Sequence, residues 1–145
     1  MRVAVATTLA AVLLPLATGC GQSQGYCDAV HDHQSELGTI VNSGDRTALI
    51  KALPIFEDLR DKAPDDVSDD WDLVVTRIRG LDDALHDAGL DPATYDAKHP
   101  PTGLSDADRA AIRRAAAQLA ASDTQDALDS VQQEVRDVCH TPLEL

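Results

Sequence analysis

Cysteine and histidine are the residues of this 145-residue chain with the most distinctive chemistry, and it has three of the first and five of the second. Cys20 and Cys27 lie seven positions apart, whereas Cys139 lies near the C-terminus. Thiols can pair as disulfides, bind metal ions or act as nucleophiles, and the redox state of the compartment selects among these roles. The cysteines therefore bear on both location and function.

A metal site is one interpretation of the histidines. His31 lies one helical turn after Cys27, and His33 and His140 would be near it if the two ends of the domain meet. Imidazole and thiolate are common zinc ligands, but the spacing is not that of a zinc module. A metal site at His31, His33 and His140 stays an alternative, and no cofactor is expected.

An Asp–His pair is the nearest approach to a catalytic arrangement. Asp82 and His86 are four residues apart, a spacing that puts both on one face of a helix. No serine or cysteine in a nucleophile turn accompanies them, since "GLSDA" at 103–107 lacks the second glycine of such a turn. Nor is there a phosphate-binding glycine loop or an HExxH motif. The sequence therefore predicts a protein that is not an enzyme.

The N-terminus has the features of an export signal. Arg2 is followed by an uncharged, largely apolar run over residues 3–19, and small residues precede Cys20. The segment "LATGC" at 16–20 resembles the lipobox of bacterial lipoproteins. That resemblance implies cleavage before Cys20, a diacylglyceryl group on its sulfur, and a location on the extracytoplasmic face of the cell membrane. Residues 1–19 are then the signal peptide, and 20–26, which contain the polar "GQSQG", are a tether to a domain over 27–145.

This location predicts a disulfide. If Cys20 carries lipid, Cys27 and Cys139 are the remaining thiols in an oxidising compartment, where two thiols most simply pair. In the chain-closure account, a bridge that closes a loop of about 113 residues stabilises the fold by roughly 5 kcal/mol.

Charge limits the partners. The chain has 25 acidic and 12 Lys or Arg residues, for a formal net charge of −13. Such a domain repels nucleic acid and anionic lipid headgroups. We expect it to contact the membrane only through the lipid on Cys20, and to favour a basic protein partner in the envelope.

The pattern of apolar residues is helical throughout, and no stretch alternates as a strand would. Four segments follow it: 27–41, 48–59, 71–85 and 105–139. Pro54 predicts a kink or short break in the second segment, and "SDTQ", with Ser122 and Gln125 as a capping box, predicts a bend in the fourth.

Residues suited to helix ends separate these segments. Asp45, Ser68 and Ser105 are suited to helix starts, and Gly89 to a left-handed helix end. A long proline-containing connection at 90–103 follows. With few aromatic residues, the domain is expected to lack an obvious ligand cavity, although Trp71, Phe56 and this connection could frame a small groove.

The expected fold is an all-α, four-helix up-and-down bundle whose termini are joined by the disulfide. An even number of antiparallel helices brings the first helix start and the last helix end together, which the Cys27–Cys139 bridge requires. In composition the chain resembles the small Asp- and Ala-rich helical lipoproteins of high-GC Gram-positive bacteria. That resemblance implies a location and a fold class. From the anchor, the short tether and the absence of a catalytic motif, we expect a membrane-tethered, non-enzymatic binding or interaction domain of unknown partner.

Overall fold

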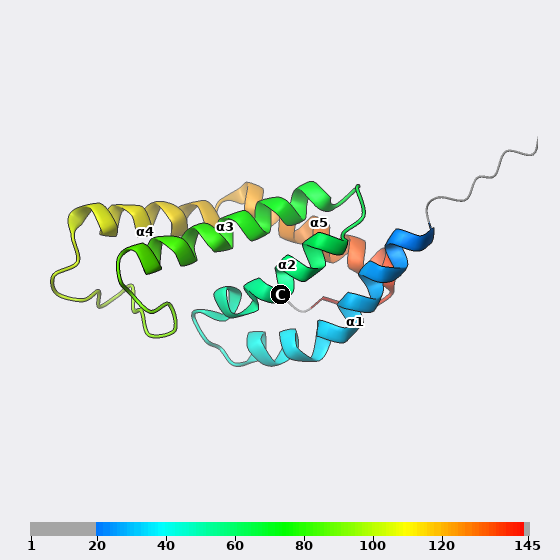
Figure 1. Ribbon diagram of the computed structural model, residues 1–145, viewed down its shortest axis with the longest axis horizontal. Helices are drawn as coiled ribbons and strands as arrows, with labels where there is room; N and C mark the ends of the chain where they lie inside the picture. Colours follow the sequence, from blue (N-terminus) through cyan, green and yellow to red (C-terminus); the bar gives the residue numbers. More distant parts are fainter. Residues whose placement is uncertain (1–19, 144–145) are drawn as a thin grey trace, which may run out of the picture.

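A computed structural model describes residues 20–143, and all the regular secondary structure in this part of the chain is helical, as expected (Figure 1). It contains five helices and no strand: α1 (Cys20–Asn42), α2 (Ala48–Lys62), α3 (Ser68–Asp87), α4 (Asp106–Leu119) and α5 (Ser122–Cys139). No helix among these residues is long and apolar enough to cross a membrane. The predicted signal peptide over 1–19 lies outside the described residues.

Helix α3 is the centre of the arrangement. It packs against α2, α4 and α5, while α1 packs against α2 and α5. Figure 1 shows α4 and α5 following one another along α3, with α4 beside its C-terminal half. The start of α1 and the connection at 90–103 lie at opposite ends of the long axis (Figure 1).

The main core is built on the aromatic residues. Trp71 of α3 is fully buried, and its ring centroid lies 5.8 Å from that of Phe56 on α2. The Trp71 indole nitrogen donates a hydrogen bond of 2.8 Å to the hydroxyl of Tyr26, which is also fully buried. Aliphatic residues of α1, α2, α3 and α5 pack around this group. Apolar burial of this kind supplies most of the driving force for folding.

The expected four-helix bundle is not confirmed, because five helices form within residues 20–143. The segment 105–139, predicted as one bent helix, is divided at Ala120–Ala121, where Ala121 adopts an extended backbone. Buried Thr124 stabilises the break, since its hydroxyl donates to the Gln118 carbonyl at 2.9 Å. The predicted capping box does not form: Ser122 is the first residue of α5, and the Gln125 side chain bonds to Ala120.

Two further local expectations differ from the structure. The predicted tether at 20–26 is helical, because α1 begins at Cys20. Its polar residues have no apolar stripe from which a helix could be predicted. In α2, the helix continues through Pro54, so no break occurs there. Pro54 is exposed. Because proline has no backbone N–H, the helix lacks one hydrogen bond at this position. A kink at Pro54 stays a prediction.

The helix ends follow the sequence in most places. Gly89 has a φ of 69°, and the amides of Gly89 and Leu90 bond back to the carbonyls of His86 and Leu85, which is a Schellman motif. Ser105 accepts a hydrogen bond from the Asp108 amide, as an N-cap does. These two ends fix where the connection leaves α3 and enters α4.

Two of the predicted helix starts are displaced. Val67 takes the N-cap position of α3, so Ser68 is its first residue. Asp45 lies before α2, and its carboxylate accepts hydrogen bonds from the amide and hydroxyl of Thr47. Lys51 also bonds to Asp45, and these contacts hold the pKa of its carboxyl below the ordinary value. Asp45 therefore stabilises the turn before α2 and does not occupy the N-cap position of that helix.

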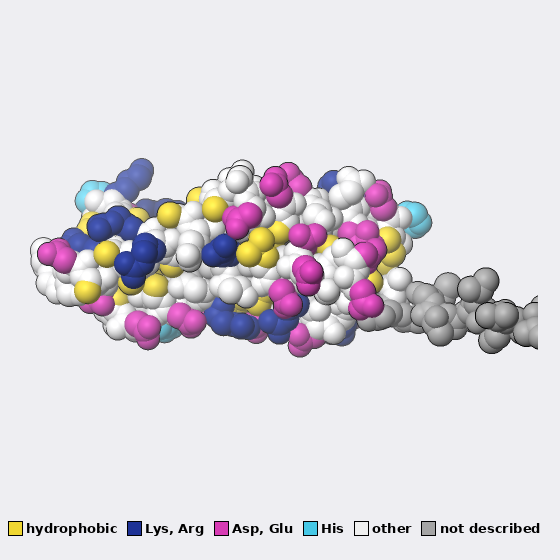
Figure 2. Space-filling view, turned by 90° about the horizontal axis from the view of Figure 1, so that it is seen from above, with side chains coloured by type: hydrophobic (Ala, Val, Ile, Leu, Met, Phe, Trp, Pro, Cys, Tyr) yellow, Lys and Arg dark blue, Asp and Glu magenta, His cyan; other side chains and the backbone are white. Residues whose placement is uncertain are grey.

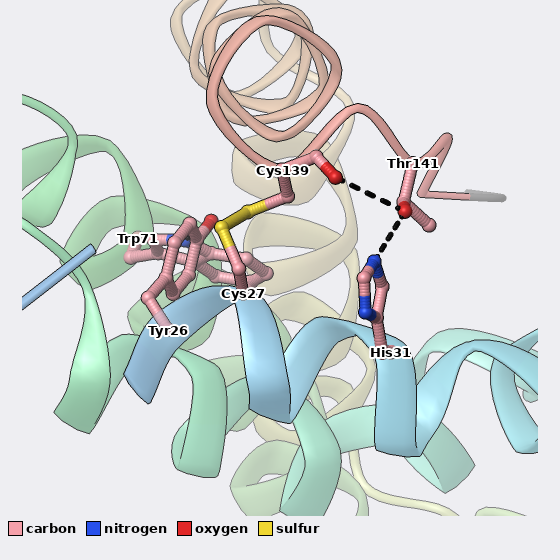
Figure 3. Close-up of a disulfide and its surroundings, with 6 residues drawn as sticks. All are labelled: Tyr26, Cys27, His31, Trp71, Cys139 and Thr141. Carbon is pink, nitrogen blue, oxygen red and sulfur yellow. Dashed lines mark hydrogen bonds between the residues drawn. A yellow bond between two sulfur atoms is a disulfide. The ribbon is translucent and has the colours of Figure 1, made fainter. Parts of the chain in front are cut away.

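The disulfide between Cys27 and Cys139 is confirmed. Their Cα atoms are 5.1 Å apart across a sequence separation of 112 (Figure 3). Tyr26 and Trp71 lie on one side of the bridge, and His31 and Thr141 lie on the other (Figure 3). After Cys139 the chain turns at His140, whose φ is 54°, and Leu143 is buried in the core. The bridge thus joins the first and last helices at one end of the molecule.

Candidate functional site

The histidines of the alternative metal site do not come together. A ring nitrogen of His31 bonds to the Thr141 hydroxyl, and His33 bonds to Asp58 at 3.0 Å on α2. His140 is exposed. Among residues 20–143, no group of three His, Cys, Asp or Glu side chains could hold a metal ion. The structure therefore offers no ligand set at His31, His33 and His140.

The Asp82–His86 pair forms, but on an open surface. The His86 Nδ1 lies 3.3 Å from the Asp82 carboxylate and 3.0 Å from its backbone carbonyl, and the His86 side chain is 61% exposed. Such (i, i+4) pairs are routine on solvated helix faces. Neither residue is among those that line the pocket described next.

A pocket of about 370 Å³ lies where the connection at 90–103 crosses the C-terminal half of α3. The turn into α2 and the inner face of α4 complete its walls. Its volume is within the range of small-molecule sites. The Schellman motif at Gly89 and the cap at Ser105 position this connection, so both helix ends bear directly on the pocket.

The inner lining of the pocket is apolar. The larger apolar and aromatic side chains that line it are Ile50, Leu81, Leu85, Pro92, Tyr95 and Ile112. Leu85 and Ile112 are almost fully buried, yet they do not belong to the main core cluster around Trp71. Among the described helices, α4 packs closely against α3 and against no other helix. This second apolar region therefore borders the pocket and is not covered by a further helix.

The mouth of the pocket is basic. Four of the chain's 12 Lys and Arg residues line it: Arg46, Lys98, Arg109 and Arg113. Asp96 is the one acidic residue among the described lining residues. Figure 2 shows Lys and Arg side chains gathered beside hydrophobic ones at this end of the molecule. A cationic site of this kind is unexpected on a chain whose net charge is −13.

The cations differ in their partners. Arg46 pairs with Asp96 at 2.8 Å, and the Arg109 Nε donates to the Leu104 carbonyl at 3.1 Å. Within residues 20–143, no carboxylate lies at ion-pair distance from Lys98 or Arg113, and both are exposed. These two cations are therefore available to a ligand at the mouth.

Asp96 organises the connection. Its carboxylate interacts with the His99 ring at 3.1 Å, accepts a hydrogen bond from the Lys98 amide at 2.9 Å, and pairs with Arg46. The His99 and Lys98 contacts, followed by the charge of Arg46, lower the pKa of Asp96 to about 2. Asp96 is thus ionised and already satisfied, and the contact with Arg46 ties the connection to the turn before α2.

The expected absence of an obvious cavity is wrong. The connection at 90–103 does frame one, but Trp71 and Phe56 belong to the core and do not line it. Two sequence signals point to the site in retrospect. They are the unusual length of the connection and the grouping of Lys98, Arg109 and Arg113 in an acidic chain.

No protein-family model, characterised protein sequence or solved structure matches this chain. The chemistry of the site must therefore be argued from its own residues. An apolar pocket with a cationic mouth can bind and orient a small molecule.

Proposed function

We propose that this chain is a membrane-tethered extracytoplasmic lipoprotein whose helical domain is a non-enzymatic binding module. Its binding site is the pocket between α3, α4 and the connection at 90–103. The observation that carries the proposal is the pocket itself, an apolar cavity of about 370 Å³ with basic residues at its mouth. Cavities of this size and composition typically bind small molecules.

Two features support the extracytoplasmic location. The segment "LATGC" at 16–20 resembles a lipobox, and the Cys27–Cys139 disulfide is of the kind that persists outside the cytoplasm. A lipid on Cys20 would put the pocket at the end of the domain away from the bilayer, because α1 begins at the opposite end (Figure 1). The site would then face the surroundings of the cell, where it can meet soluble ligands, while the acidic remainder of the domain would suit a basic envelope protein.

Intact-mass measurement of the membrane-extracted protein tests the anchor. For the wild type, we expect the mass of residues 20–145 plus a diacylglyceryl modification. The Cys20→Ala variant should keep residues 1–19 and gain no lipid. A wild-type protein with an unmodified Cys20 would overturn this part of the proposal, whatever the pocket binds.

A matched pair of substitutions on α4 tests the pocket. Ala116 and Ala117 are both exposed, but only Ala116 is among the residues that line the pocket. Ala116→Trp should fill the cavity and abolish binding of any amphipathic probe, and Ala117→Trp should leave binding unchanged. Circular dichroism and the unfolding midpoint of both variants establish that they fold. Equal binding by the two folded variants would contradict the assignment of the pocket as the binding site.

A further inference from the structure

We infer that the pocket binds an amphipathic anion, a molecule with a single carboxylate or phosphate head and an apolar body. The inference rests on the proposed function and names the ligand class of that same site. Lys98 and Arg113 would hold the head at the mouth, and the body would lie against Ile50, Leu81 and Tyr95.

The charge at the mouth selects the sign of the head. Four cationic lining residues face one carboxylate, Asp96, which already interacts with Arg46, His99 and the Lys98 amide. Exposed Lys98 and Arg113 have no carboxylate partner within residues 20–143. Arginine also suits both heads, because its planar guanidinium can donate two parallel hydrogen bonds to a carboxylate or phosphate.

The apolar lining selects the body. Ile50, Leu81 and Tyr95 are half-buried and leave apolar surface open to the pocket, above the buried Leu85 and Ile112. A fully polar anion such as inorganic phosphate would leave this lining unfilled. An apolar body gains free energy by removing the lining from water, at about 25 cal/mol per Å².

Four probes with a dodecyl or dodecanoyl chain separate these contributions. They are dodecanoate, dodecanoyl lysophosphatidic acid, neutral 1-dodecanol and cationic dodecyltrimethylammonium. Binding is measured by calorimetry below micelle-forming concentrations, on residues 20–145 with Cys20→Ser, which retain every described helix. Residues 20–145 lack Arg2 and have a formal net charge of −14, which favours cations nonspecifically, so a preference for the acidic probes must come from the pocket.

We expect at least one acidic probe to bind about tenfold or more tightly than the neutral and cationic probes. Tighter binding of dodecanoate would identify a free fatty acid as the source of the ligand. Tighter binding of the lysophospholipid would identify a phosphate headgroup. Either result supports the inference.

Two adjacent arginines provide the matched control. Arg113→Glu should weaken binding of the acidic probe by about ten- to a hundredfold, without weakening that of the neutral probe. Arg114→Glu makes the same charge change one residue away, outside the pocket lining, and should change affinity by less than about threefold. Equal effects of the two substitutions would overturn the role of Arg113.

The two levels of the proposal fail differently. If the neutral probe binds as tightly as the acidic ones and Ala116→Trp still abolishes binding, the pocket is a binding site but the ligand class is wrong. If no probe binds, or if Ala116→Trp leaves binding intact, the pocket is not the binding site and both proposals fall.

Discussion

The hydrogen bond between Trp71 and Tyr26 is the polar contact on which the main core depends most. Both side chains are fully buried, so neither can turn to water. Tyr26→Phe would leave the Trp71 indole N–H buried without an acceptor, and we expect it to lower the free energy of unfolding by about 1–3 kcal/mol. Urea denaturation measures this loss. Tyr95→Phe, at a half-buried position in the connection, is the control and should change stability by less than about 0.5 kcal/mol.

The same residue predicts a loss of stability in alkali. Burial, with a smaller contribution from Glu134 and Asp66, raises the pKa of Tyr26 from 10.0 to about 12, against the opposing hydrogen bond from Trp71. As pH rises, the Tyr26 hydroxyl loses its proton in the unfolded chain before it does so in the folded one. The contribution of Tyr26 to the free energy of unfolding is therefore complete below about pH 10 and falls as pH rises toward 12. The stability difference between wild type and Tyr26→Phe should narrow by roughly 1 kcal/mol between about pH 10 and 11. A constant difference would contradict the raised pKa.

Gly80 lies within α3 and Gly89 follows its C-terminal end. Substituting each by alanine distinguishes the effect of backbone conformation from that of packing. A methyl group added at Gly80 or Gly89 would meet no atom within 4 Å. Gly80 is inside the helix, so Gly80→Ala should raise the free energy of unfolding by about 0.5–1 kcal/mol. Gly89 has a φ of 69°, so Gly89→Ala should lower it by about 1–2 kcal/mol. Thermal unfolding measures the change in stability of both variants. Changes of the same sign would show that backbone conformation does not determine these effects.

The helices were predictable where apolar periodicity and a capping residue coincide. In α3, the stripe through Trp71 and Leu85 and the glycine at 89 predict both its buried face and its end. The first turns of α1 carry no such stripe, so their helical state was missed. The break before Ser122 was predicted as a bend, because the sequence shows residues that favour a helix start but not the Thr124 contact that separates the two helices.

The disulfide is the feature that acts on the whole molecule. Replacing Cys27 and Cys139 by serine should lower the free energy of unfolding by about 2–5 kcal/mol, because the unfolded chain regains the freedom of a long loop. Urea denaturation of the double variant measures the loss, and wild type unfolded in reductant is its control. An unchanged midpoint in both would contradict a stabilising role for the bridge.

At the scale of the whole molecule, the sequence predicted the covalent link but not the pocket. The disulfide follows from the number of cysteines and the expected compartment. The pocket needs the relative positions of Ile50 on α2, Leu85 on α3 and Ile112 on α4. Periodicity predicts that Leu85 and Ile112 face inward, but the predicted stripe of the second helix omits Ile50, and nothing in the pattern shows that the connection at 90–103 completes a pocket with them.

The bridge also determines how the molecule responds to mechanical load. A pull applied at Cys20 reaches Cys27 and passes through the sulfur atoms directly to Cys139, without stretching the chain between them. Pulled at Cys20 and Leu143, the oxidised chain between them can lengthen only over residues 20–26 and 140–143. The pocket lies wholly within the shielded segment, between residues 46 and 116. A ligand site on a surface exposed to shear would therefore keep its shape for as long as the two cysteines stay joined.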